Sequence, residues 1–165
     1  AAAAIAEMAI GRIGDDTTVN VGQIEGGRAS NIVPDYCEVS GELRSFSHEK
    51  ALEELAKVEQ IFAKEAEKRG GSIEFIRDIC YQAYKTDEKE SVVKEFQKAC
   101  TACGIKSSLI ATFGGSDQNK MSEHGIPGIV MASAMHQVHS CQEYTEVSEM
   151  AQVAGIVSEL LQMKE

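Results

Sequence analysis

The sequence lacks several features that would assign it to common binding classes. It has no tryptophan and only 5% aromatic residues, so it offers no evident platform on which nucleic-acid bases could stack. Basic residues are a minority, because 16 Lys and Arg stand against 26 Asp and Glu and the formal net charge is -10. This balance attracts neither nucleic acid nor an anionic membrane surface. No apolar run approaches the roughly 18 residues of a membrane-spanning helix. We therefore predict no nucleic-acid partner and no membrane partner.

The sequence also lacks the signs of a secreted protein. Its five cysteines are an odd number at irregular spacing, unlike a small disulfide scaffold, and no basic segment leads into an apolar stretch at the start. We predict a cytoplasmic location. Cys100 and Cys103 form a Cys-x-x-Cys pair, but a zinc ribbon needs a second pair. The pair also ends a helical stretch instead of beginning one, so we interpret both as helix cysteines of the interior.

Two units are predicted along the 165 residues, with a boundary at residues 83 and 84. Helical and alternating patterns in 1–83 predict a helix, two strands, a helix and a strand, over 1–10, 17–25, 36–43, 47–66 and 72–80. This order is typical of a ferredoxin-like α+β unit that lacks its first strand.

The second unit, 84–165, alternates helices with short apolar strands. The pattern predicts helices over 91–103 and 119–124, strands over 109–113 and 129–132, and a last helix capped by Thr145. Strands that are apolar on both faces are typical of a parallel α/β sheet covered on both sides. Two strands are too few for an independent sheet, so we expect this unit to pack against additional sheet.

The densest cluster of chemically active residues lies in 135–143, directly after a predicted strand. It contains His136, His139 and Glu143. Ligand sites of open α/β sheets lie at the carboxyl ends of strands, and imidazole and carboxylate suit zinc. The alternative is a pair of solvated loop histidines.

Two further loops could bind a ligand. In 112–117, Gly114 and Gly115 let the backbone approach an anion, but Ser116 or Asp117 could equally cap the next helix. In 30–35, Asn31 could donate to a carbonyl or carboxylate. A plain connection between two strands is the better interpretation of that loop from the residues alone.

Taken together and in order, these motifs resemble those of peptidase T-like enzymes. Those enzymes belong to the zinc metallopeptidase family that also includes aminoacylase, carboxypeptidase G and succinyl-diaminopimelate desuccinylase. The segments that resemble the family's lid are 11–13, 17–22, 24–27, 30–35 and 41–45. The segments that resemble its catalytic domain are 114–117, 125–127 and 139–143.

The resemblance implies roles for several residues. His139 and Glu143 match the family's His-x-x-x-Glu signature, which makes His139 a metal ligand. Asn31 resembles the lid asparagine that reaches the active site. The loop of Gly115, Ser116 and Asp117 resembles the segment that contacts the substrate. His136, Glu143 and Arg44 are additional candidate site residues.

The resemblance also implies a fold and an activity. It implies an incomplete ferredoxin-like lid, through which two copies dimerise, followed by the C-terminal part of an α/β catalytic domain with two divalent metal ions, zinc by preference. Small peptides or N-acyl amino acids would be hydrolysed by metal-activated water.

The family's other metal ligands and its general base lie in motifs that this sequence does not contain. We therefore assign no catalytic base here and expect the isolated chain to be inactive, without a stably bound metal. The alternative is a non-catalytic dimerisation or binding module.

Overall fold

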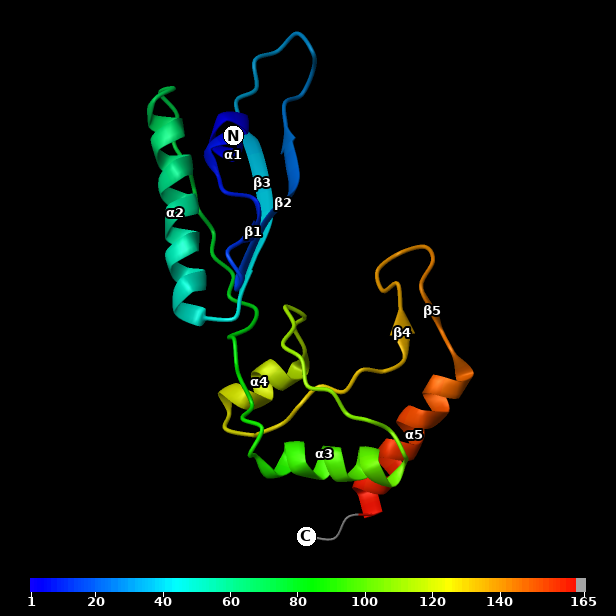
Figure 1. Ribbon diagram of the computed structural model, residues 1–165. Coiled ribbons are helices and arrows are strands. Elements are labelled where there is room, and N and C mark those ends of the chain that lie inside the picture. The colour runs from blue at the N-terminus through cyan, green and yellow to red at the C-terminus, as the bar shows by residue number, and fades with distance from the viewer. Residues whose placement is uncertain (163–165) are drawn as a thin grey trace. The chain divides into compact units, whose positions relative to one another are not determined.

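The computed structural model describes residues 1–162, and the chain divides into two compact units, Ala1–Ala83 and Tyr84–Glu165 (Figure 1). Both units mix helices with strands. Within the described residues, no helix is both long enough and apolar enough to cross a membrane.

The first unit contains an antiparallel sheet of three strands in the order β1-β2-β3. Its strands are β1 (Gly11–Ile13), β2 (Thr17–Gly26) and β3 (Cys37–Ser45). A register shift between Val21 and Gln23 marks a bulge in β2. The helix predicted over 1–10 is shorter, since α1 (Ala2–Glu7) ends before Gly11, and residues 11–13 form a strand that the sequence pattern did not predict.

The long helix α2 (His48–Glu67) begins where the sequence predicted. The Ser47 side chain accepts a hydrogen bond from the Lys50 backbone N–H, at 3.4 Å, and so caps the helix. Helix α2 contacts β3 and α1 and runs along the sheet (Figure 1). The predicted apolar face of α2 is half-buried at Leu55, Val58, Ile61, Phe62 and Ala66, as expected for a helix that packs on one side. Leu52, at the start of that face, is 40% exposed.

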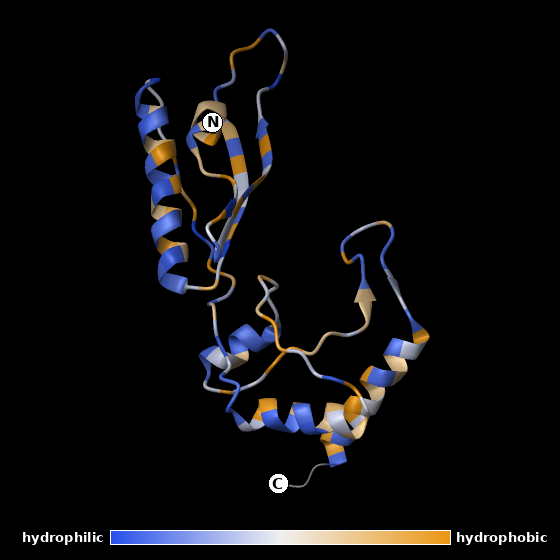
Figure 2. Cartoon of the chain, viewed as in Figure 1, coloured by the Kyte–Doolittle hydropathy of each residue, from blue (hydrophilic) through white to orange (hydrophobic). Residues whose placement is uncertain are grey.

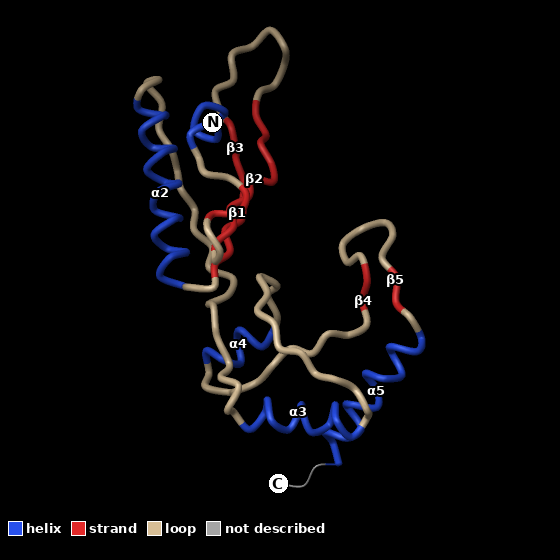
Figure 3. Tube along the Cα trace, viewed as in Figure 1, coloured by secondary structure: helices blue, strands red, loops and turns tan. Residues whose placement is uncertain are grey.

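The strand predicted over 72–80 is not a strand in this structure. The segment between α2 and α3 is drawn as loop in Figure 3, although hydrophobic colour recurs along it in Figure 2. Ile76 is 82% exposed there. Alternating residues describe only the two faces of a strand, and a strand also needs a neighbour for its backbone N–H and C=O groups. Within residues 1–162, no segment pairs with 72–80.

The second unit is built on α3 (Ser91–Ala102), α4 (Asp117–Glu123) and α5 (Val147–Gln162). All three helices were predicted from the sequence. Helix α3 packs on α5, where Ala99, Cys100 and Ile156 form a small buried core. Apolar residues of α5 outside this core are exposed, and Val147 and Leu161 are each 82% exposed.

The strands predicted over 109–113 and 129–132 are also unpaired. Ile110 is 84% exposed, and the only strands described in this unit are the two-residue β4 (Met135–His136) and β5 (Tyr144–Thr145), which pair antiparallel. The parallel sheet expected here is therefore absent from the described residues, for the same reason: no neighbouring segment supplies hydrogen-bond partners. The prediction that Thr145 caps α5 is wrong, because Thr145 lies in β5 and its hydroxyl donates to the Ala134 carbonyl.

Candidate functional site

The segment from Ala134 to Thr145 forms a closed loop on a short hairpin. Met135 pairs with Thr145, and His136 pairs with Tyr144. The Thr145 hydroxyl donates to the Ala134 carbonyl oxygen at 2.6 Å. The hairpin thus closes the base of the loop that carries most of the predicted metal-binding residues.

The backbone of this loop adopts an uncommon conformation. Ala134, Gln137 and His139 have positive φ values of 59°, 52° and 63°. These are the only residues other than glycine in the left-handed region among the 162 described. Such strain persists only where surrounding contacts enforce it, and it concentrates at functional sites. The strain therefore singles out this loop within the described chain.

His139 and Glu143 lie together in the loop, as their spacing suggested. The His139 backbone N–H donates to Glu143 Oε2 at 2.9 Å, and both residues are exposed. The carboxylate thus holds the backbone of His139, while the imidazole remains at the surface. A surface imidazole on a constrained backbone can serve as one ligand to a metal such as zinc.

His136 has different surroundings. Its Nε2 lies 2.5 Å from Glu149 Oε2 of α5, and its ring stacks on Tyr144 with centroids 4.8 Å apart at 15°. Sequence reasoning did not identify Glu149 or Tyr144. Their contact with His136 depends on the hairpin and on the position of α5, for which the local sequence carries no signal.

The donor set of this loop fits part of a metal site. In the described part of the chain, no three His, Cys, Asp or Glu side chains gather closely enough to hold a metal ion. Catalytic zinc takes about three protein ligands and a water molecule. Among the described residues of this loop, His139 could therefore supply a single ligand and would not hold such a metal by itself.

The second predicted loop begins helix α4. Ser116 is the N-cap residue and forms a capping box with Asn119, whose Oδ1 accepts from the Ser116 backbone N–H at 3.0 Å. Gly115 and Asp117 are exposed on either side of it. The interpretation of Ser116 as a helix cap is thus confirmed. Gly115, Ser116 and Asp117, which were predicted to contact the substrate, are consecutive residues at the start of α4.

Asn31 and Arg44 belong to the first unit. Asn31 is exposed in the loop between β2 and β3, whose two sides are joined by an ion pair of 2.7 Å between Arg28 and Asp35. Arg44 donates to both carboxylate oxygens of Glu42, at 2.7 and 2.8 Å. The guanidinium holds the pKa of Glu42 below its ordinary value, so Arg44 already has a carboxylate partner.

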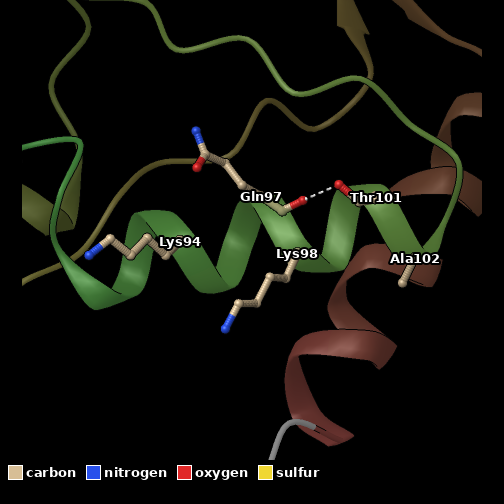
Figure 4. Close-up of a pocket in the computed structure, with 5 residues that line it drawn as sticks. All are labelled: Lys94, Gln97, Lys98, Thr101 and Ala102. Atoms are coloured by element: carbon tan, nitrogen blue, oxygen red, sulfur yellow. Dashed lines mark hydrogen bonds between the residues drawn. The ribbon is translucent and has the colours of Figure 1, made fainter.

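His139 lines neither of two hollows in the surface. One of about 350 Å³ lies at the base of the loop that carries Asn31, where the Tyr36 hydroxyl donates to Glu38 and the pKa of Tyr36 is raised by that carboxylate. Another of about 560 Å³ lies on α3 (Figure 4). Its lining residues are Lys94, Gln97, Lys98, Thr101 and Ala102. All five residues belong to α3, so this hollow follows one helix and contains no predicted site residue. Within it, the Thr101 hydroxyl donates to the Gln97 carbonyl.

Cys100 of α3 and Cys103, the residue that follows this helix, lie where α3 packs on α5. Cys100 is buried between α3 and α5, and Cys103 is half-buried. Burial, followed by the neighbouring Cys103, raises the pKa of the Cys100 thiol. An activated thiol needs a lowered pKa. The interpretation of these residues as interior helix cysteines is confirmed for Cys100.

Comparison with known proteins gives a consistent set of relatives. The peptidase dimerisation domain of the M20 type matches residues 1–70. A Bacillus subtilis protein described as uncharacterized, YqjE, is 33% identical over 98% of this chain and 44% of its own length. Peptidase T of Geobacillus thermodenitrificans is 26% identical over 74% of this chain and 31% of its own. The chain thus spans less than half the length of the curated relatives that it matches.

Solved structures agree with these relatives. Aminopeptidase PepT from Bacillus cereus is 34% identical, with a TM-score of 0.81, over 98% of this chain and 44% of that one. A tripeptidase from Staphylococcus aureus is 28% identical with a TM-score of 0.90, over 98% of this chain and 43% of that one. YxeP from Bacillus subtilis, described as a dinuclear metal-binding peptidase, shares the fold with a TM-score of 0.68. The match has 18% sequence identity and covers 87% of this chain and 41% of that one.

Proposed function

We propose that this chain, whose residues 1–70 match the M20 peptidase dimerisation domain and which is similar to an aminopeptidase and a tripeptidase, forms part of a metal-dependent peptidase for small peptides. The observation that carries the proposal is the strained loop that presents the His139 imidazole at the surface. Tripeptides or peptides with a free amino end are the preferred substrates in this proposal, in keeping with the relatives named an aminopeptidase and a tripeptidase. N-acyl amino acids are the alternative substrate class.

We assign His139 as a ligand to one of two divalent metal ions, with zinc the preferred metal. When bound, the metal supplies a Lewis acid and an activated water molecule. Glu143 contributes by holding the His139 backbone through its 2.9 Å hydrogen bond. The loop of Gly115, Ser116 and Asp117, together with Asn31, contacts the substrate in this proposal. Arg44, already paired with Glu42, is a secondary candidate.

The 165-residue chain alone is not expected to catalyse hydrolysis. One imidazole does not hold a catalytic metal ion, because such sites need about three protein ligands. The general base would likewise come from residues of the longer relatives that have no counterpart in this chain. Residues 1–83 would act as the lid, and two copies would associate through it; 84–165 would contribute to the catalytic domain. We also propose a cytoplasmic location, which five free cysteines, three of them exposed, support.

A chimeric enzyme tests this function. The part of Bacillus cereus PepT that aligns with this chain is replaced by residues 1–165, and hydrolysis of a tripeptide is measured. We expect the chimera to be active and His139→Ala to lower kcat/KM by more than about 100-fold, because even partners of a ligand change metal affinity 10- to 100-fold. Gln142→Ala, in the same loop, is the control. Unchanged activity of His139→Ala would refute the assignment of this ligand, whereas a folded but inactive chimera would favour a non-catalytic dimerisation or binding module.

A further inference from the structure

The loop that presents His139 is held at its base by three side chains from separate elements, His136 of β4, Tyr144 of β5 and Glu149 of α5. We propose that these three residues, which we call the clasp, position His139, and that His136 is a positioning residue and not a second metal ligand. The inference rests on the proposed role of His139 as a ligand, but its physical content is the geometry of the loop.

The clasp joins the hairpin to the helix that follows it. His136 Nε2 and Glu149 Oε2 lie 2.5 Å apart across thirteen positions of the sequence, and one face of the imidazole is covered by the Tyr144 ring at 4.8 Å. Both His136 and Glu149 are half-buried, with 37% of each side chain exposed. A hydrogen bond to a carboxylate is stronger than a neutral one, and it is less screened here than between fully exposed groups. The clasp therefore fixes both ends of the loop to α5.

The loop needs such an anchor because its conformation is costly. Left-handed backbone at Gln137 and His139 disfavours any residue with a Cβ, by about 1–2 kcal/mol each. Inside the loop, the Ser140 hydroxyl donates to the Gln137 carbonyl at 2.7 Å, and the Ser140 side chain accepts from the Gln142 N–H. These bonds are local and exposed. The clasp supplies the contact with an element outside the loop.

The two histidines are thereby separated in role. The Nε2 of His136 is engaged by Glu149, and its ring is stacked, whereas His139 is exposed and is held only through its backbone N–H. A carboxylate bound to a histidine is also the arrangement found behind many metal-bound histidines. The two roles make opposite predictions for which ring responds to metal.

The test uses nuclear magnetic resonance on the full chain. Glu149→Ala and Tyr144→Ala each remove one clasp contact, Tyr144→Phe keeps the stacked ring, and Glu159→Ala is a control on the same helix. We expect backbone order parameters of residues 137–143 to fall from about 0.85 to below about 0.6 in the two disrupting variants. The couplings that report positive φ at Gln137 and His139 should be lost with them. Tyr144→Phe and Glu159→Ala should match the wild type.

Zinc ion alone, added to the wild-type chain, separates the two histidines. We expect the ring signals of His136 to stay in place at zinc concentrations that shift those of His139. The clasp is overturned if His136 responds first, or if Glu149→Ala leaves the loop order and couplings unchanged. A lower thermal midpoint without loss of loop order would indicate a merely structural contact and would also overturn it. The order and coupling measurements are independent of the chimera, since the loop can be clasped whether or not His139 binds a metal.

Discussion

At the residue scale, Glu65 near the end of α2 combines burial with charge. It is only 4% exposed, and its carboxylate accepts hydrogen bonds from Lys68 and from Arg69. These bonds, from Lys68 first and Arg69 next, lower the pKa of Glu65 from its ordinary 4.5 to about 2. The Nζ of Lys68 also lies 3.6 Å from Oε1 of Glu7 in α1, so the same group of charges connects α1 with α2.

This lowered pKa predicts a loss of stability in acid. The unfolded chain takes up a proton at Glu65 near pH 4.5, whereas the folded chain resists it until about pH 2. The stability from Glu65 is therefore present above pH 4.5 and is lost as the pH falls toward 2. Glu65→Gln should lower the urea midpoint at pH 7 and flatten its decline between pH 4.5 and 2. Glu67→Gln, an exposed neighbour on the same helix, is the control and should keep the wild-type pH profile.

At the scale of elements, the pairing of β2 with β3 depends on a close backbone approach. A Cβ at Gly41 would lie 2.5 Å from the Asn20 carbonyl oxygen, well inside contact distance. At Gly22, in the bulge of β2, the nearest atoms would be 3.9 Å away. Both glycines lie in the β2–β3 pair, but only at Gly41 would a Cβ atom overlap the neighbouring strand.

Alanine at these two glycines should therefore have different effects. We expect Gly41→Ala to destabilise the first unit by about 1–3 kcal/mol, because the backbone of β2 must move to relieve the overlap. Gly22→Ala should change stability by less than about 0.5 kcal/mol. Urea unfolding followed by circular dichroism measures both. Equal losses of stability in the two variants would show that the close approach of β2 and β3 at Gly41 does not restrict this position to glycine.

At the scale of the whole molecule, the first unit offers an open sheet edge. In the described sheet, β3 pairs with β2 alone, which leaves one side of a nine-residue strand free. A free edge is a template for another strand. Together with the match of residues 1–70 to a peptidase dimerisation domain, this edge leads us to propose that two copies associate through β3.

The chain should therefore have a solution mass of about twice 17.8 kDa in light scattering. Val39→Pro and Ser40→Pro form a matched pair, because adjacent residues of a strand direct their N–H groups alternately toward β2 and outward. The variant that loses the inward N–H should lose strand signal in circular dichroism. The other should keep its fold and become monomeric. A monomeric wild type would contradict association through this edge. So would two proline variants that both fold and both remain dimeric.

Much of the fold followed from the sequence because its causes are local. Apolar spacing predicted α2, α3 and α5, and α4 was predicted as a short helix that ends before Gly125. Ser47 and Ser116 are N-cap residues in the structure, as their residue types suggested. Strands were harder, since β1 was missed and the apolar segment 109–113 was assigned as a strand. A strand exists only with a hydrogen-bonding neighbour, which periodicity along one segment does not reveal.

The candidate site divides in the same way. The sequence by itself determined the residue types and spacing of the His139 loop, and through its motifs the resemblance to peptidases, because both depend only on the order of residues. Only the tertiary structure decided that Glu143 holds the His139 backbone, that His136 is engaged by Glu149 and Tyr144, and that Arg44 is paired. The reason is physical: these contacts depend on where a turn reverses and how a helix packs, and those positions are set by the folded chain as a whole.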